Sequence, residues 1–201
     1  MRLRSSSNRF LLHFLEILVN DLGQETLSLV LGKANLPTAW ADSKQLASSG
    51  EKGAAEAYAG LQKALRIYYG RGARGILQRA GSNMWKRLLA DAPLNVKTQA
   101  AFARRLPLPA RRRAALDLLA SLLGSKRGDV AVHTLDLDLL LADHASPGAS
   151  GQFESEPVCF VTLGLLHECL FWATGQEHDI QETSCKATGQ ESCEFKIITG
   201  G

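Results

Sequence analysis

Two cysteines near the end of the chain have the spacing of a metal-binding hairpin. Cys185 and Cys193 are eight residues apart, and Gly189 lies midway between them. If the chain turns at that glycine, the two thiols face one another on adjacent strands, about 5 Å apart. Both thiolates could then bind one zinc ion, which takes sulfur ligands and four-fold coordination. The alternative is a pair of buried thiols without a metal, and the spacing alone favours neither.

The other two cysteines cannot both join such a site. Cys159 and Cys169 are separated by ten residues, which is roughly 15 Å along a helix that begins at Phe160. Cys159 precedes this helix and is free to turn toward the hairpin. Cys169 is flanked by Leu166 and Leu170 and is predicted to be a small core residue. The residues open as a fourth ligand are Glu182, Glu168, His167, His178 and Glu191.

A glycine-rich segment offers a second candidate site. Residues 70–75, GRGARG, match G-x-G-x-x-G, but a dinucleotide site needs a strand before the first glycine. Here residues 61–69 have helical periodicity. We therefore predict a joint that allows two helices to approach closely.

Charge is distributed unevenly along the 201 residues. Residues 1–130 carry 21 Lys and Arg against 9 Asp and Glu, whereas residues 131–201 carry 2 against 11. The arginines between Arg104 and Arg113 lack interleaved aromatic residues, so we predict no nucleic-acid partner.

No apolar stretch reaches the ~20 residues of a membrane span, and no signal peptide fits the first residues. We expect a cytoplasmic protein with reduced thiols.

The elements that must position these residues follow from periodicity. Apolar residues at three- and four-residue steps predict helices near 10–22, 58–68, 77–88 and 116–123, with a loop at 32–53. Alternation over 132–139 predicts one strand, and 160–174 is predicted to be an amphipathic helix that ends at Gly175. Strands near 177–184 and 192–198 follow. Helices followed by a small antiparallel sheet with one packed helix indicate the α+β class.

The same segments resemble the vinyl-4-reductase domain family. Residues 157–175 (PVCFVTLGLLHECLFWATG) precede residues 182–197, which have the pattern E-x-x-C-x-A-x-G-x-x-x-C-x-F-x-I. The basic helical part is similar as well, above all residues 69–81. The resemblance covers most of the chain and is densest over 157–197.

This resemblance implies a ligand set and a fold. In related sensory domains of aromatic-responsive bacterial transcription regulators, the matching positions hold a structural zinc, and they fall here on Cys159, Glu182, Cys185 and Cys193. The implied fold is the α+β ligand-binding fold shared with haem–nitric-oxide sensors and vesicle-tethering subunits. It is usually a homodimer through its N-terminal helices. We expect one domain over 1–201, with a basic helical part (1–125) and a zinc-bearing α+β part (126–201).

An apolar ligand pocket between helices and sheet is also implied. Its candidate lining residues are Leu137, Leu139, Leu163 and Ile180, which would suit a small hydrophobic molecule, although a leucine stripe is also ordinary core. The first functional hypothesis is a sensor or carrier that presents its bound state to a protein partner. The alternative is a tetrapyrrole vinyl reductase or pigment carrier in (bacterio)chlorophyll synthesis. Binding is favoured over reduction, because no motif for a hydride or electron source is present and zinc is redox-inert.

Overall fold

The computed structural model describes residues 6–42, 53–126 and 128–199. The helical part contains α1 (Ser6–Leu22), α2 (Gln24–Lys33), the short helix η1 (Thr38–Ala41), α4 (Ala54–Tyr69), η2 (Gly70–Gly72), α5 (Ala73–Ala90), α6 (Leu94–Ala103) and α7 (Leu108–Leu123). The remainder contains β1 (Val130–Leu135), β2 (Asp138–Asp143), η3 (Pro147–Ala149), α8 (Phe160–Thr174), β3 (Asp179–Ser184), η4 (Lys186–Thr188) and β4 (Cys193–Ile198). No helix of the described residues is long and apolar enough to cross a membrane.

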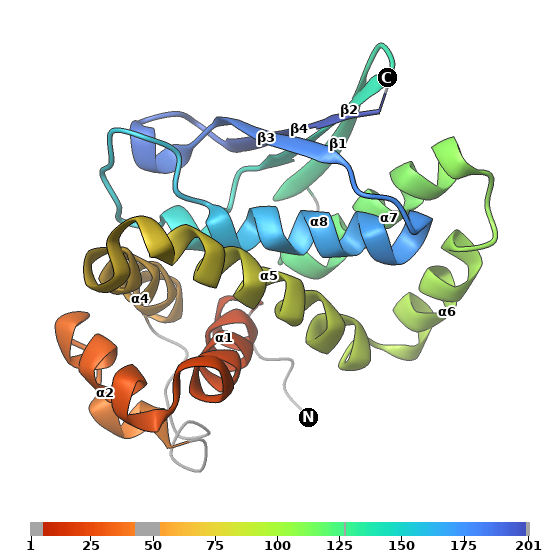
Figure 1. Ribbon diagram of the computed structural model, residues 1–201. Helices are drawn as coiled ribbons and strands as arrows, with labels where there is room; N and C mark the ends of the chain where they lie inside the picture. Colours follow the sequence, from red (N-terminus) through yellow and green to blue (C-terminus); the bar gives the residue numbers. More distant parts are fainter. Residues whose placement is uncertain (1–5, 43–52, 127, 200–201) are drawn as a thin grey trace.

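The strands form one antiparallel sheet in the order β1-β2-β4-β3 (Figure 1). The prediction of a single strand over 132–139 is wrong, because β1 and β2 form a hairpin in which Leu135 pairs with Asp138. Asp136 lies in the turn with a φ of 53°, a conformation that aspartate tolerates better than most residues. The turn residues continue the apolar and polar alternation, so the pattern hides the reversal.

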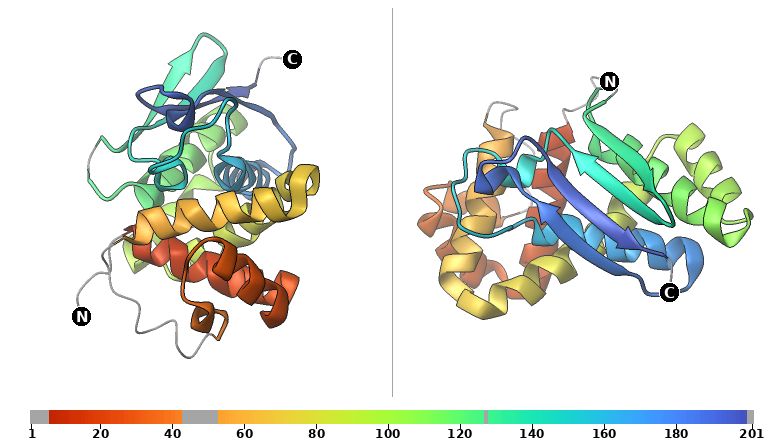
Figure 2. Two further views of the ribbon diagram at one scale, coloured as in Figure 1. Left: turned by 90° about the vertical axis from the view of Figure 1, so that its left-hand side faces the viewer. Right: turned by 90° about the horizontal axis from the view of Figure 1, so that it is seen from above.

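Helix α8 lies at the centre of the fold, between the sheet and α5 (Figure 2). It ends at Gly175, whose φ of 71° is left-handed, as predicted. The expectation of an amphipathic helix is wrong, because α8 is covered by the sheet, α5 and α7 on different sides. Its buried residues therefore occur around the helix instead of along one stripe: Val161, Leu163, Gly164, Leu165, Leu166, Cys169, Leu170 and Ala173.

Two helical glycines allow α5 and α8 to touch through their backbones. A Cβ atom at Gly81 would lie 2.0 Å from the carbonyl oxygen of Val161, and one at Gly164 would lie 1.9 Å from that of Gln78. Both distances are far below van der Waals contact, so only glycine permits this crossing. The crossing fixes the position of α8, and with it the position of Cys159 at its N-terminus.

The N-terminal helices pack on the other side of α5. Residues 24–33 form α2, so the predicted loop over 32–53 begins two residues later, and residues 43–52 lie outside the described part of the chain. Helix α6, between Pro93 and Pro107, has no clear apolar stripe and the periodicity did not predict it.

The short helix at Gly70–Gly72 joins α4 to α5. The predicted joint between two helices is thus confirmed, but the close approach expected there is not found, because a Cβ atom at Gly70, Gly72 or Gly75 would meet nothing within 4 Å.

Side chains from both parts of the chain connect the layers. A single cluster of buried apolar residues includes members of α1, α5, α8 and the sheet. Arg113 on α7 donates to the carbonyl of Val132 on β1 at 2.8 Å, and Arg66 on α4 pairs with Glu154 at 2.8 Å. Several arginines of the basic part therefore bind groups of the acidic part.

Candidate metal centre

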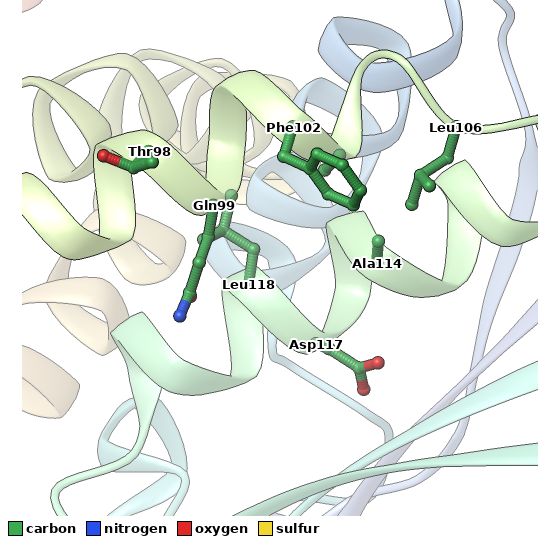
Figure 3. Close-up of a pocket in the computed structure, with 8 residues that line it drawn as sticks. Thr98, Gln99, Phe102, Leu106, Ala114, Asp117 and Leu118 are labelled. Atoms are coloured by element: carbon green, nitrogen blue, oxygen red, sulfur yellow. The ribbon is translucent and has the colours of Figure 1, made fainter.

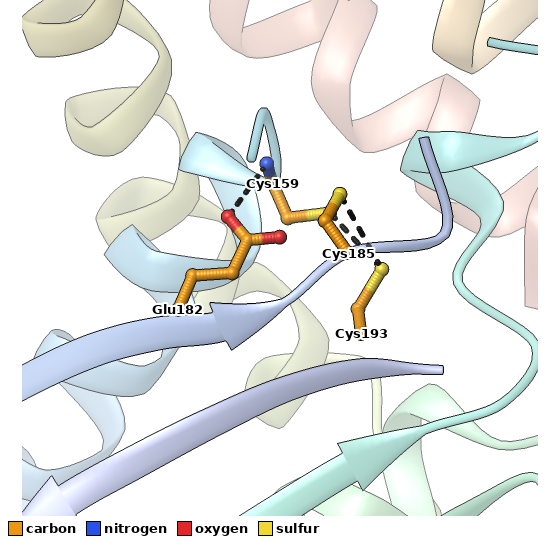
Figure 4. Close-up of side chains that lie close together, drawn as sticks. All are labelled: Cys159, Glu182, Cys185 and Cys193. Atoms are coloured by element: carbon orange, nitrogen blue, oxygen red, sulfur yellow. Dashed lines mark hydrogen bonds between the residues drawn. The ribbon is translucent and has the colours of Figure 1, made fainter. Parts of the chain in front are cut away.

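Three elements bring Cys159, Glu182, Cys185 and Cys193 together (Figure 4). Cys159 is the residue before α8, where the chain enters the helix. Glu182 belongs to β3, and Cys185 follows the end of that strand. Cys193 is the first residue of β4. The N-terminus of α8 thus faces the end of the hairpin.

A bulge in β3 orients two of these side chains. Glu182 and Cys185 are three residues apart, and in a regular strand such residues point to opposite faces. The pairing of β3 with β4 shifts by one residue between Glu182 and Ser184. An extra residue in one strand reverses the alternation beyond it, so Glu182 and Cys185 point to the same side. The shifted register also sets Cys185 opposite Cys193, as the midpoint at Gly189 predicts.

The distances among the sulfur atoms suit a tetrahedral ion. The Sγ atom of Cys159 lies 3.4 Å from that of Cys193 and 3.8 Å from that of Cys185, and the remaining pair is 3.9 Å apart. Tetrahedral zinc with Zn–S bonds of about 2.3 Å separates its sulfur ligands by roughly 3.8 Å. One ligand atom from each of the four residues lies within 4.8 Å of the others. The residues therefore fit a zinc-sized ion.

Glu182 contributes a buried oxygen that has no partner. Its Oε2 atom accepts a hydrogen bond of 3.1 Å from the backbone N–H of Cys159. Its Oε1 atom is buried without a hydrogen bond to any described residue and points toward the thiols (Figure 4). Burial, and after it the proximity of Cys185, raises the pKa of Glu182 to about 8. A cation at this point would satisfy the oxygen and offset the cost of burying the carboxylate.

The thiol of Cys159 shows the same need for positive charge. The hydrogen bonds of Cys159 to Cys185 and Cys193, together with burial, raise the pKa of Cys159 well above its usual value. A bound metal ion stabilises thiolates and would reverse this shift. The N-terminus of α8 also favours negative charge at Cys159.

Two hydrogen-bonding groups around the thiol cluster, one from the backbone and one from a side chain, complete its environment. The N–H of Lys186 donates to the Sγ of Cys193 at 3.3 Å, and the hydroxyl of Ser146 lies 3.8 Å from the Sγ of Cys159. Such donors stabilise metal-bound thiolates. No sequence signal points to these donors, because a backbone N–H carries no residue identity and Ser146 lies in a loop.

The remaining candidate ligands lie elsewhere. Cys169 is fully buried and contacts the carbonyl of Ala115 on α7 at 3.3 Å, as expected for a core thiol. Glu168 pairs with Lys86 at 3.2 Å. His178 accepts from the Nε of Arg112 at 3.0 Å. Neither these groups nor His167 and Glu191 belong to the thiol cluster.

Of the four residues predicted to line the ligand pocket, one lies on the surface and three lie in the core. Leu137 lies in the β1–β2 turn with 78% of its surface exposed, so it cannot line an enclosed pocket. Leu139 and Ile180 both pair with Ile197 and therefore form one row across the sheet. These two residues and Leu163 are buried in the continuous core. The surface hollows described below are lined by other residues.

Comparison with known proteins identifies the C-terminal part of the chain. Residues 144–199 match the family model of the V4R domain, and this segment includes all four residues of the cluster. No curated protein sequence matches the chain.

Solved structures show the same fold at low sequence identity. The phenol-responsive sensory domain of the transcription activator PoxR, in complex with phenol, is 16% identical, with a TM-score of 0.51 over 71% of this chain and 73% of that one. An H-NOX protein from S. oneidensis in its Fe(II)NO state is 13% identical, with a TM-score of 0.56 over 98% of this chain and 99% of that one. An H-NOX structure from a study of heme distortion is 10% identical, with a TM-score of 0.50 over 95% and 93%. The predicted α+β fold of this kind is confirmed. Residues 144–199 are thus similar to the V4R domain family, as the sequence predicts, and the chain shares its fold with the PoxR sensory domain and with H-NOX proteins.

Proposed function

We propose that this chain is a zinc-stabilised domain that binds a small hydrophobic molecule and signals its bound state to a protein partner. Cys159, Glu182, Cys185 and Cys193 would hold the zinc. The observation that carries the metal proposal is the buried, unpartnered Oε1 of Glu182 beside three thiols at tetrahedral spacing. Four protein ligands leave no open coordination position, so the ion would crosslink the hairpin to α8 and take no part in catalysis.

The sensor role is supported by the family match and the fold. The PoxR sensory domain responds to phenol, and the H-NOX relatives bind haem, which shows that this architecture accepts small ligands in other proteins. We propose the layer between α8 and the sheet as the ligand site, at Leu139, Leu163 and Ile180. Because these residues are buried in the core, binding there requires that side chains move apart to admit the ligand.

A second candidate function has a specific observation in its favour. The H-NOX protein from S. oneidensis aligns over 98% of this chain, and a tetrapyrrole carrier would use the same fold. A pigment carrier or tetrapyrrole vinyl reductase of (bacterio)chlorophyll synthesis is therefore the alternative. An absorbance band of a tetrapyrrole that copurifies with the protein would favour it, and NAD(P)H-dependent turnover would establish reduction.

We also propose that residues 1–201 form one domain, that the protein is cytoplasmic, and that it acts as a homodimer through its N-terminal helices. The core that α1, α5, α8 and the sheet share supports the one-domain proposal. The dimer rests on the family resemblance.

Native mass spectrometry of protein purified without chelators tests the metal, the ligand and the dimer together. We expect one zinc per chain and a mass of two chains. Cys185→Ala should lose the zinc, whereas the matched control Cys169→Ala also removes a buried thiol but should keep it. If the hairpin of Cys185→Ala does not fold, Glu182→Gln gives the second variant, because it retains an oxygen acceptor for the N–H of Cys159. A fully folded wild-type protein without zinc would show that the thiols form only a hydrogen-bonded cluster.

A further inference from the structure

A surface hollow of about 490 Å³ lies where the end of α5, helix α6 and the end of α8 meet. Figure 1 shows these elements converging at the end of α8 that is remote from Cys159. The volume is in the range of small-molecule sites. Its apolar lining consists of Trp85, Leu89, Ala90, Ala100, Ala101 and Trp172.

Two tryptophans dominate the apolar part of this hollow. The rings of Trp85 and Trp172 are 5.4 Å apart and meet edge to face at 62°. Trp85 is only 1% exposed, and its indole Nε1–H is buried without an acceptor among the described residues. Buried indole N–H groups are normally paired, because an unsatisfied buried donor is costly. A ligand oxygen could accept a hydrogen bond from this N–H only after the side chains that cover the indole move apart.

The charged residues around the hollow are all cationic. Lys86, Lys97 and Arg104 line it, and no carboxylate does. Lys86 is engaged with Glu168 at 3.2 Å. Within the described ranges, neither Lys97 nor Arg104 forms an ion pair, and the guanidinium of Arg104 lies 5.6 Å from the centre of the Trp172 ring. Two cations are therefore available beside an aromatic surface.

A neighbouring hollow lacks these features. It lies between α6 and α7, has a volume of about 520 Å³ and is lined by apolar residues such as Phe102 and Leu118 (Figure 3). Its only charged lining residue is Asp117, which already pairs with Arg113 at 3.1 Å. The combination of aromatic rings, unpaired cations and an unsatisfied N–H distinguishes the hollow at Trp85.

We propose that the hollow at Trp85 and Trp172 binds a small aromatic carboxylate. The ring would lie against Leu89 and Trp172, which are partly exposed, and the carboxylate would bind Lys97 and Arg104. Charged hydrogen bonds of this kind are stronger than neutral ones. The site does not depend on the zinc or on the layer between α8 and the sheet, so it can fail while the proposed function holds.

The test uses 2-naphthoate and its uncharged analogue 2-naphthamide on the full chain carrying Trp40→Phe. Because the chain has three tryptophans, this substitution leaves indole signals only from Trp85 and Trp172. We expect 2-naphthoate to quench their fluorescence and to shift the Trp85 indole N–H resonance, and 2-naphthamide to bind at least about tenfold more weakly.

Matched variants locate the binding. Arg104→Gln should weaken 2-naphthoate about tenfold, whereas Arg105→Gln makes the same charge change at a residue outside the hollow and should have no effect. Ala101→Phe should fill the hollow and abolish binding without adding an indole signal. Equal affinities for the two probes, equal effects of the two arginine variants, or unchanged binding in Ala101→Phe would each overturn the proposal. Zinc content, measured on the same samples, reports separately on the proposed function.

Discussion

The two ends of α8 carry opposite kinds of chemistry. At its N-terminus, Cys159 and Glu182 belong to a buried cluster of acidic groups. At its C-terminus, Trp172 lies beside an open hollow lined by cations. One end thus needs a cation and the other suits an anion.

The backbone of α8 accounts for much of this difference. A helix has partial positive charge at its N-terminus and partial negative charge at its C-terminus. The N–H of Cys159 binds the carboxylate of Glu182 at 3.1 Å, while Arg111 contacts the carbonyl of Ala173 at 3.5 Å. The carboxylate of Glu182 thus lies at the start of this helix, and basic residues such as Lys97 and Arg111 lie at its end, although Glu177 and Asp179 also follow the helix there.

Removal of zinc should have the largest effect and should be confined to the N-terminal end of α8. A chelator should lower the free energy of unfolding by about 4 kcal/mol relative to protein with free zinc at a thousand times its Kd. Hydrogen exchange should accelerate at the backbone N–H groups of Cys159 and Lys186, while the fluorescence of Trp85 and Trp172 stays constant. A chelator that changes both ends equally would contradict this separation of the two ends.

Gly164→Ala should disturb both ends, because it separates α8 from α5. The added Cβ would lie 1.9 Å from the carbonyl oxygen of Gln78, and overpacking of a rigid contact costs about 3 kcal/mol. Urea unfolding measures the loss, and zinc affinity should fall with it.

Gly75→Ala is the matched control for this crossing. Gly75 also lies in a helix, but a Cβ there would meet nothing within 4 Å. We expect it to stabilise the protein by up to about 1 kcal/mol, since alanine is the better helix former. A similar loss in both variants would show that the glycines act through helix propensity and not through the contact.

The surroundings of the N-terminal end of α8 could be predicted in part from the sequence. The turn of the cysteine hairpin and the end of α8 follow from local signals at Gly189 and Gly175, and the family pattern places Cys159 before α8. The bulge that turns Glu182 toward the thiols does not, because its position depends on the pairing with β4. For this reason the residues alone left the fourth ligand open.

The elements that surround the C-terminal end of α8 are harder to predict from the sequence. Helix α6 has no clear apolar stripe, and the hollow that it lines together with Trp85 and Trp172 brings together segments far apart in the sequence. The prediction that α8 is amphipathic is wrong for a related reason. Periodicity reports one covered side, whereas three elements cover this helix.

The smallest effect concerns pH at the C-terminal end. His178 accepts a hydrogen bond from Arg112 at 3.0 Å, which requires a neutral ring. Burial, and after it the charge of Arg112, lowers the pKa of His178 below its usual value of 6.5. The unfolded chain therefore binds a proton more readily, and the contribution of His178 to stability is lost as the pH falls through about 6.5.

Because the side chain is partly exposed, we expect this loss to be below about 1 kcal/mol between pH 7.5 and 5.5. Urea unfolding of the wild type and of His178→Gln at both pH values measures it, and the difference between the two proteins cancels the pH dependence of zinc binding. The wild type should lose more stability than the variant on acidification. Parallel losses would mean that the ring of His178 is not held neutral by Arg112, and that the cationic character of this end of α8 does not extend to the segment before β3.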